Sequence, residues 1–144
     1  MEQAIKEKAM CIFHHDGKIL VSKHFDSVKN ENFYRMLGGG VNFSETSEAG
    51  IRREIQEELS SDIENLKLLD VIENIFTFEG VKGHEICFLY TGDLAKKELY
   101  SQDSIHVVED TYEFNAKWVA LEDILNGSVP LYPIFDYKNL LNKI

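Results

Sequence analysis

Apolar residues occur in short runs separated by polar turns along the first 40 positions, which is the pattern of a β-rich fold. The dipeptide Asp16-Gly17 predicts a tight hairpin turn, because both central positions of a type I′ turn require positive φ. Residues 27–32 are polar and predict a loop. The three runs predicted to be strands are residues 6–14, 18–25 and 33–37.

Three consecutive glycines, Gly38, Gly39 and Gly40, follow the third predicted strand. Such a run is a poor strand or helix interior, so we expect regular structure to break there. We also expect unusual backbone angles and the close approach of another group.

A helical period is clearest over residues 46–59, where Ile51, Ile55 and Leu59 form an apolar stripe at i, i+4 and i+8. Thr46 is the expected N-cap, because its hydroxyl is able to accept a hydrogen bond from the first turn. The sequence therefore predicts one amphipathic helix directly after the glycines.

The second half of the chain predicts mainly strands, with a turn at residues 79–83 and a polar stretch at 95–110. Strands that flank one central helix, with helices at the end of the chain, predict an α+β fold in which two sheets carry helices on their outer sides. The predicted elements are strands over 66–80, 84–94 and 113–121 and short helices over 121–125 and 133–144.

The chain has 144 residues, of which 44% are hydrophobic, and a net charge of −10. This is the size of one domain, and no linker or repeat divides it, so we expect a single domain over 1–144. An acidic surface disfavours nucleic-acid polymers and anionic membranes. No apolar run is long enough for a membrane span, and no signal peptide is recognisable. Cys11 and Cys87 lie in apolar runs and predict free core thiols in the cytoplasm.

The predicted helix presents three carboxylates beside its apolar stripe. At about 100° per residue, Glu54, Glu57 and Glu58 are able to converge on one point. Like charges at these spacings cost roughly 0.2–0.5 kcal/mol per pair unless a cation lies between them. Hard divalent ions such as Mg²⁺ and Mn²⁺ prefer carboxylate oxygens. The alternative is a solvated charged face, and the helix alone does not decide between the two.

The spacing around this helix resembles the signature of the Nudix hydrolase family, G-x5-E-x7-R-E-U-x-E-E-x-G-U, in which U is a bulky aliphatic residue. Gly39, Glu45 and the run from Arg53 to Glu58 match every charged position and the first glycine. The hairpin "DGKILVSKH", the later strand pair and a tryptophan strand running into "LEDIL" also resemble the family.

This resemblance implies an α/β/α sandwich with a mixed sheet, the signature helix on one side and C-terminal helices. It implies a pyrophosphohydrolase that uses Mg²⁺, or Mn²⁺, and acts on a small nucleotide-type diphosphate. In the family pattern Arg53 orients the glutamates, and Glu45 ties the loop to the helix. The implied metal ligands are the carboxylates of Glu54, Glu57 and Glu58 and the carbonyl of Gly38.

The general base stays open between Glu54 and a carboxylate that precedes the last strand. Three acids in that region are candidates for this role or for a further metal ligand, namely Glu109, Asp110 and Glu113, and we favour Glu113. The alternative for each is an exposed loop acid. The predicted catalytic residues are therefore Arg53, Glu54, Glu57 and Glu113.

Two positions depart from the family signature, because Ser60 replaces its second glycine and Ser61 the aliphatic residue after it. We expect them to alter the helix exit, where glycine serves as a left-handed cap. Arg35, just before the glycines, is a weak candidate for a phosphate contact. Several aromatic residues belong either to the core or to a nucleobase site, namely Phe33, Tyr34, Phe76, Phe78 and Tyr90.

Two other functions fit parts of this pattern. One is a non-catalytic Nudix-fold module that binds a nucleotide to sense it or to regulate a partner, and the other is an acidic partner-binding surface without metal dependence. The presence of every acid of the signature favours the enzyme. The sequence leaves open the substrate and whether the chain forms a homodimer, although its short length favours nucleoside triphosphates.

Overall fold

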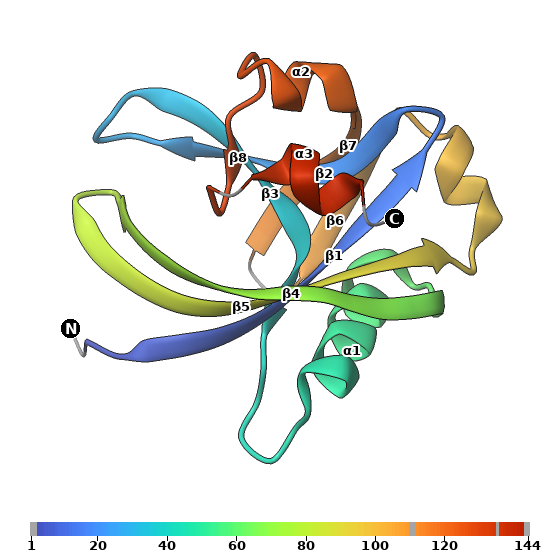
Figure 1. The fold of residues 1–144 in the computed structure, drawn as a ribbon, viewed down its shortest axis with the longest axis horizontal. Coiled ribbons are helices and arrows are strands. Elements are labelled where there is room, and N and C mark those ends of the chain that lie inside the picture. The colour runs from blue at the N-terminus through green and yellow to red at the C-terminus, as the bar shows by residue number, and fades with distance from the viewer. Residues whose placement is uncertain (1–2, 110–111, 135, 143–144) are drawn as a thin grey trace.

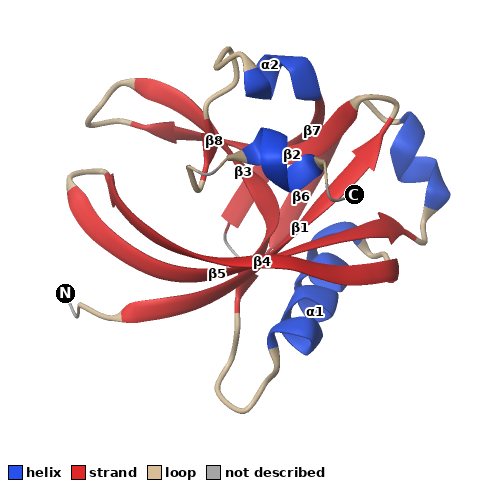
Figure 2. Cartoon of the chain, in the orientation of Figure 1, coloured by secondary structure: helices blue, strands red, loops and turns tan. Residues whose placement is uncertain are grey.

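The structure, a computed structural model, describes residues 3–109, 112–134 and 136–142. A mixed sheet forms the centre of the molecule and helices lie on both sides of it (Figures 1 and 2). In chain order the elements are β1 (Ile5–His15), β2 (Lys18–Asp26), β3 (Glu31–Gly40), α1 (Ser47–Leu59), β4 (Ile63–Phe78), β5 (Val81–Leu94), the 3₁₀-helix η1 (Lys97–Ser101), β6 (Ser104–Glu109), β7 (Tyr112–Ala120), α2 (Leu121–Leu125), β8 (Leu131–Tyr132) and α3 (Tyr137–Leu141).

The strands follow the order β4-β5-β1-β3-β2-β7-β6, and β8 pairs with β3. The β1–β5 and β3–β8 pairs are parallel, whereas the other pairs are antiparallel. The turn between β1 and β2 has the predicted geometry, since Asp16 and Gly17 have φ values of 50° and 73°. The two predicted sheets are thus joined through β1 and β3 into one mixed sheet.

The middle of β1, residues 9–13, is buried on both faces, which explains why this part of the strand is continuously apolar. Ala9, Cys11 and Phe13 pack in one core with the apolar stripe of α1, whereas Met10 and Ile12 pack in a second core on the other face. Helix α1 covers the first face, and α2 and α3 lie on the opposite side (Figure 1). The predicted α+β sandwich is therefore confirmed. None of the helices in the described ranges has the length and apolarity that crossing a bilayer requires.

Helix α1 begins as its sequence predicts, but Ser60 does not alter its exit in the expected way. The hydroxyl of Thr46 accepts a hydrogen bond from the Ala49 amide at 3.1 Å, which confirms Thr46 as the N-cap. The helix ends at Ser60, which adopts the left-handed conformation with φ of 53° and ψ of 41°. Ser60 thus occupies the position for which glycine is the least strained residue.

The prediction that the three glycines leave regular structure is wrong. Gly38, Gly39 and Gly40 form the end of β3 and pair with Met10, Ala9 and Lys8 of β1. The buried β1 strand supplies their backbone hydrogen bonds, so tertiary pairing outweighs the poor strand propensity of glycine. Gly38 also has φ of 147°, as expected for unusual backbone angles.

Three element boundaries also differ from the prediction. The polar stretch at 95–110 contains η1 and β6, because pairing with β7 orders residues that have little strand pattern of their own. The turn after β4 is confined to Glu79 and Gly80. The last predicted helix is shorter than expected, since α3 spans Tyr137–Leu141.

Candidate functional site

Gly39 lies directly beneath the carboxylate of Glu54. A Cβ atom added at Gly39 would lie 2.4 Å from the Glu54 Cδ and 2.5–2.6 Å from both of its oxygens, so no other residue fits without displacing this carboxylate. A Cβ at Gly38 would lie 2.0 Å from the Ala9 carbonyl oxygen. The absence of side chains on β3 therefore brings α1 against the strand, as the close approach predicted for the glycines requires.

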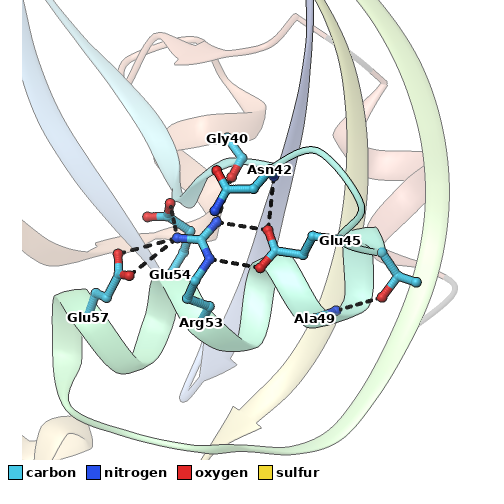
Figure 3. A network of polar contacts seen from close by, with 8 residues as sticks. Gly40, Asn42, Glu45, Ala49, Arg53, Glu54 and Glu57 are labelled. Carbon is cyan, nitrogen blue, oxygen red and sulfur yellow. Dashed lines mark hydrogen bonds and ion pairs between the residues drawn. The ribbon is translucent and has the colours of Figure 1, made fainter.

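Arg53 connects the acidic residues of α1 to the glycine strand (Figure 3). Its guanidinium donates two hydrogen bonds to Glu45, at 2.9 and 3.0 Å, and one to the Gly40 carbonyl at 2.8 Å. The remaining nitrogen, Nη1, lies 2.9 Å from Glu54 Oε1 and 3.4 Å from both carboxylate oxygens of Glu57. One arginine therefore holds the loop, the strand and two helix carboxylates together.

The Arg53 hydrogen bonds hold Glu45 in its charged form. Together with the backbone amide of Asn42, which donates at 3.0 Å, they lower the pKa of Glu45 to about 2. The same contact with Glu45, followed by that with Glu54, raises the pKa of Arg53. Glu45 is thus a fixed anion that keeps Arg53 in place.

The three helix carboxylates have different surroundings. Glu54 and Glu58 are each 9% exposed, whereas the side chain of Glu57 is 43% exposed. No three acidic, histidine or cysteine side chains in the described ranges lie close enough together to form a ready-made metal cluster. The structure instead places Arg53 between Glu54 and Glu57, so part of the positive charge expected near these acids comes from the chain itself.

A small cavity of about 200 Å³ adjoins the glycines. Glu58 lines it from α1, Gly38 and Gly39 line it from β3, and Lys8 lines it from β1. This cavity contains oxygen donors and a cation at the point where α1 meets the sheet. The carboxylate of Glu58 is of the kind that suits Mg²⁺ or Mn²⁺. Glu54 does not line this cavity, but its carboxylate lies against Gly39, which does.

A larger hollow of about 620 Å³, which we call the aromatic cleft, lies between the β2–β3 hairpin and β4. His24 and Arg35 line both the aromatic cleft and the small cavity, so the two spaces adjoin. Four aromatic side chains also line the cleft, namely Phe33, Phe76, Phe78 and Tyr132. Flat apolar walls of this kind suit a nucleobase.

Arg35 is fixed at the junction of these two spaces. Its Nη2 donates to Glu85 Oε1 at 2.8 Å, and its guanidinium carbon lies 5.9 Å from the centre of the Phe76 ring. The Phe76 ring itself lies over Gly83, where an added Cβ would be 2.3 Å from the ring. The Phe76 ring thus packs against Gly83, and the Arg35 guanidinium lies over the same ring.

The far end of the aromatic cleft is closed where two hairpin tips meet. Asp26 of β2 accepts hydrogen bonds from the amides of Val28, Lys29 and Glu79 at 3.0, 3.1 and 3.2 Å. Burial opposes ionisation of Asp26, but these backbone hydrogen bonds prevail and lower its pKa. The Ser27 amide also donates to Glu79 at 3.0 Å, so the tips of β2–β3 and β4–β5 are joined.

The structure does not bring Glu113 to the α1 carboxylates. Glu113 is exposed on β7 and lies 3.6 Å from His106 of β6. Its neighbour Phe114 lines the small cavity with Glu58, and successive side chains of a strand point to opposite faces. Asp110 lies outside the described residues, as does the side chain of Glu109.

The sequence does not single out His24, which the structure places in both spaces. His24 stacks on Phe33, with ring centres 5.4 Å apart, and lies 2.8 Å from the Ser22 hydroxyl. Burial and, secondarily, Arg35 lower its pKa to about 4, so it is neutral at pH 7. The signal was in the alternation of β2, where polar Ser22, His24 and Asp26 share the inner face while Phe25 is exposed.

The two cysteines are structural. Cys11 and Cys87 are buried free thiols, and burial raises the pKa of Cys87 to about 12. Neither residue has the thiolate character that a nucleophile needs at neutral pH.

Comparison with known proteins gives consistent matches along the whole chain. A family model described as the NUDIX domain matches residues 6–138. An RNA pyrophosphohydrolase of Pelagibacter ubique (strain HTCC1062) is 27% identical over 142 residues, covering 92% of this chain and 86% of that protein.

Solved structures share the arrangement of strands and helices. A MutT NUDIX hydrolase from Burkholderia pseudomallei has a TM-score of 0.64 and 22% identity over 99% of both chains. A NUDIX hydrolase from Nitrosomonas europaea has a TM-score of 0.63 and 12% identity, covering 96% of this chain and 87% of that one. At these identities the two structures show the fold alone.

Proposed function

Because the chain belongs to the Nudix family, we propose that residues 1–144 form one domain that hydrolyses a diphosphate linkage in a nucleoside diphosphate joined to another group. The prediction of a Nudix pyrophosphohydrolase is confirmed at the level of the family. One observation carries the finer proposal. The cavity beside Glu58 and the glycines adjoins an aromatic cleft, so a diphosphate and its nucleoside fit side by side.

The α1 acids and the glycine strand fit a divalent cation, for which we propose Mg²⁺, with Mn²⁺ as the alternative. The proposed ligands are the carboxylates of Glu54, Glu57 and Glu58 and the carbonyl of Gly38. When bound, such an ion supplies positive charge for the phosphoryl oxygens and lowers the pKa of a coordinated water. The buried positions of Glu54 and Glu58 favour this role, because a cation offsets the cost of burying two like charges.

The remaining residues of the site position these groups. Arg53 is proposed to orient Glu54 and Glu57 from one guanidinium, and Glu45 fixes Arg53. We propose Glu54 as the general base, since its carboxylate lies against Gly39 next to the cavity that Glu58 lines. Glu113 is not included, because none of its described contacts links it to α1.

The aromatic cleft is proposed to hold the nucleoside. Phe33 and Phe76 offer stacking surfaces for the base. His24 is neutral, so its ring adds an uncharged surface to the cleft. Arg35 lies between the nucleoside and diphosphate regions. Its position therefore suits a contact with the substrate on the nucleoside side of the diphosphate.

The test is release of phosphate or pyrophosphate from a panel of nucleoside triphosphates, nucleotide sugars and dinucleoside polyphosphates, with and without Mg²⁺. We expect turnover of at least one compound that is lost with chelator and restored by Mg²⁺ or Mn²⁺. If no compound is hydrolysed while some raise the melting temperature, the chain is a nucleotide-sensing module instead. If neither turnover nor any metal dependence is found, the acidic surface binds a partner.

A second candidate substrate is the 5′ end of RNA, because the relative from Pelagibacter ubique is an RNA pyrophosphohydrolase. The net charge of −10 disfavours this substrate, since an acidic protein as a whole repels the phosphates of an RNA chain. A 5′-triphosphorylated oligonucleotide and the matching nucleoside triphosphate decide between them. We expect the free nucleotide to have the higher kcat/KM, and the reverse result would assign the chain to RNA ends.

The buried free thiols Cys11 and Cys87 fit a reducing compartment, and we propose that the enzyme acts in the cytoplasm. Homodimer formation stays a prediction of the sequence.

A further inference from the structure

A third hollow, of about 710 Å³, lies beside the N-terminal half of β1 and the start of β5. We call it the lysine groove, because Lys6, Lys8 and Lys82 line it. It shares Phe76 and Phe78 with the aromatic cleft. It also shares Lys8 with the small cavity beside Glu58, so the groove continues from the proposed diphosphate site.

The positive charges of the lysine groove are not neutralised by the residues around them. Lys6, Lys8 and Lys82 form no ion pair with any residue in the described part of the chain. By contrast, Lys96 and Lys97, on η1 or next to it, pair with glutamates. The groove is thus a concentration of free cationic groups in a chain whose net charge is −10.

Of the two acids that line the groove, Glu85 is paired with Arg35, whereas none of the described ion pairs involves Glu79. Glu85 is 5% exposed and accepts a hydrogen bond from Arg35 at 2.8 Å. Glu79 accepts hydrogen bonds from the amide and the hydroxyl of Ser27. Glu7 lies between Lys6 and Lys8 in sequence, but strand alternation directs it to the other face of β1, and it does not line the groove. Three lysines thus line the groove with one carboxylate that has no cationic partner among the described ion pairs, and this excess of positive charge attracts anions.

We infer that the group joined to the nucleoside diphosphate is itself anionic and carries at least one further phosphate, which Lys6 and Lys82 bind. This inference rests on the proposed function and narrows its substrate. The nucleoside occupies the aromatic cleft, the diphosphate lies near Lys8 and Glu58, and the second group extends into the lysine groove. An uncharged sugar in that position leaves the lysines without a partner, whereas a phosphate accepts hydrogen bonds from ammonium groups.

Two kinds of small molecule share this chemistry, namely nucleoside triphosphates and dinucleoside polyphosphates. The discriminating measurement is kcat/KM for one nucleoside triphosphate, one dinucleoside polyphosphate and one nucleotide sugar with the same base. Wild-type protein is compared with Lys6→Gln and Lys82→Gln, both at exposed positions where folding is not at stake. Lys23→Gln is the matched control, because Lys23 is exposed on β2 and lines neither the cavity, the cleft nor the groove.

We expect each groove variant to lower kcat/KM about tenfold for the phosphate-rich substrates and less than about twofold for the nucleotide sugar. Lys23→Gln leaves all three values unchanged. A larger loss with the dinucleoside polyphosphate than with the triphosphate identifies the former as the source of the bound phosphate. If kcat/KM falls equally for the phosphate-rich substrates and the nucleotide sugar, or does not fall at all, the inference is overturned. The proposed hydrolysis is not affected by that result.

A binding measurement tests the lysine groove independently of the proposed hydrolysis. Inorganic tripolyphosphate, titrated into metal-free protein by calorimetry, is expected to bind about tenfold more weakly to the Lys6→Gln/Lys82→Gln double variant than to wild type. Added salt weakens wild-type binding and narrows this difference. Equal affinities in the two proteins would contradict the lysine groove as a phosphate site. Absence of turnover with every substrate would instead refute the proposed function.

Discussion

Helix α1 and the aromatic cleft hold their charged groups in different ways. Around α1, three glutamates close in sequence each contact Arg53 directly, namely Glu45, Glu54 and Glu57. In the cleft, Arg35 is held by Glu85, which lies 50 residues further along the chain. The first arrangement follows from one loop and one helix, whereas the second exists only after the strands have paired.

The difference separates two tasks that one substrate requires. The α1 region concentrates oxygen donors and fixes them with a single arginine, which suits electrostatic work on phosphoryl groups. The cleft offers four aromatic side chains as flat surfaces, which suits binding of a nucleobase. Changes at α1 should therefore affect kcat, and changes in the cleft should affect KM.

The strongest test of this division is Glu57→Gln. We expect kcat to fall by about 10²–10³-fold with KM little changed, because removing one preorganised charged group from such a site has an effect of this size. Glu48→Gln is the control, since Glu48 lies in the first turn of the same helix and pairs with Arg52. Steady-state kinetics with Mg²⁺ measure both variants, and near wild-type turnover of Glu57→Gln would remove Glu57 from the proposed metal ligands.

The next largest effect is expected for Arg53→Lys, measured as the free energy of unfolding in urea. An ammonium group cannot reach Glu45, Glu54 and the Gly40 carbonyl together, so we expect a loss of about 2 kcal/mol. Arg52→Lys is the matched control, because Arg52 makes one hydrogen bond to the Ile63 carbonyl and a longer ion pair with Glu48. Similar losses in both variants would mean that the Arg53 network adds no particular stability.

The lowered pKa of His24 predicts how the stability of the protein depends on pH. Its folded pKa of about 4 lies below the ordinary value of 6.5, so the unfolded chain binds the proton first as the pH falls. This contribution to stability is fully present above pH 6.5 and is lost as the pH falls towards 4. Between pH 7 and 5 we expect a loss of about 2 kcal/mol that is absent in His24→Asn.

Urea unfolding at both pH values measures this difference. His106→Asn serves as the control, since His106 is exposed on β6. If wild type and His24→Asn lost the same stability between pH 7 and 5, the burial of a neutral imidazole in the cleft would be contradicted.

Phe33→Leu tests the binding half of the comparison. Loss of a stacking ring is expected to raise KM about tenfold while kcat stays within about twofold, because base–aromatic stacking contributes on the order of 1–3 kcal/mol. Phe25→Leu, on the outer face of the neighbouring strand, is the control and should leave both constants unchanged. A fall in kcat without a change in KM would place Phe33 with the reacting groups instead.

The smallest expected effect is a gain in the free energy of unfolding. Ser60 has φ of 53° at the end of α1, a conformation that glycine adopts with less strain, so Ser60→Gly should raise the free energy of unfolding by about 0.5–1 kcal/mol. Ser47→Gly, at the first position of the same helix, is expected to destabilise and shows that the gain is specific to the helix end. Thermal unfolding measures both, and a loss of stability in Ser60→Gly would show that its side chain outweighs the strain.

The parts of this molecule that depend on neighbours in sequence were predicted well. The turn at Asp16-Gly17, the N-cap at Thr46 and the stripe of Ile51 and Ile55 follow from local backbone preference and helical period. The spacing from Gly39 to Glu58 identified the family without any coordinates. Local rules suffice here, because each of these features is set by residues that are close together in the sequence.

Long-range strand pairing decided the rest. The three glycines belong to β3 because β1 pairs with them, and β6 is ordered by β7. Lys8 carries no sign of a functional role in the sequence and Arg35 only a weak one, yet sheet formation places both at the cavity that Glu58 lines. Cross-strand partners depend on register and topology, which a local pattern of apolar and polar residues does not encode. The sequence thus determined which chemistry the helix offers, and the tertiary structure decided which cations and rings surround it.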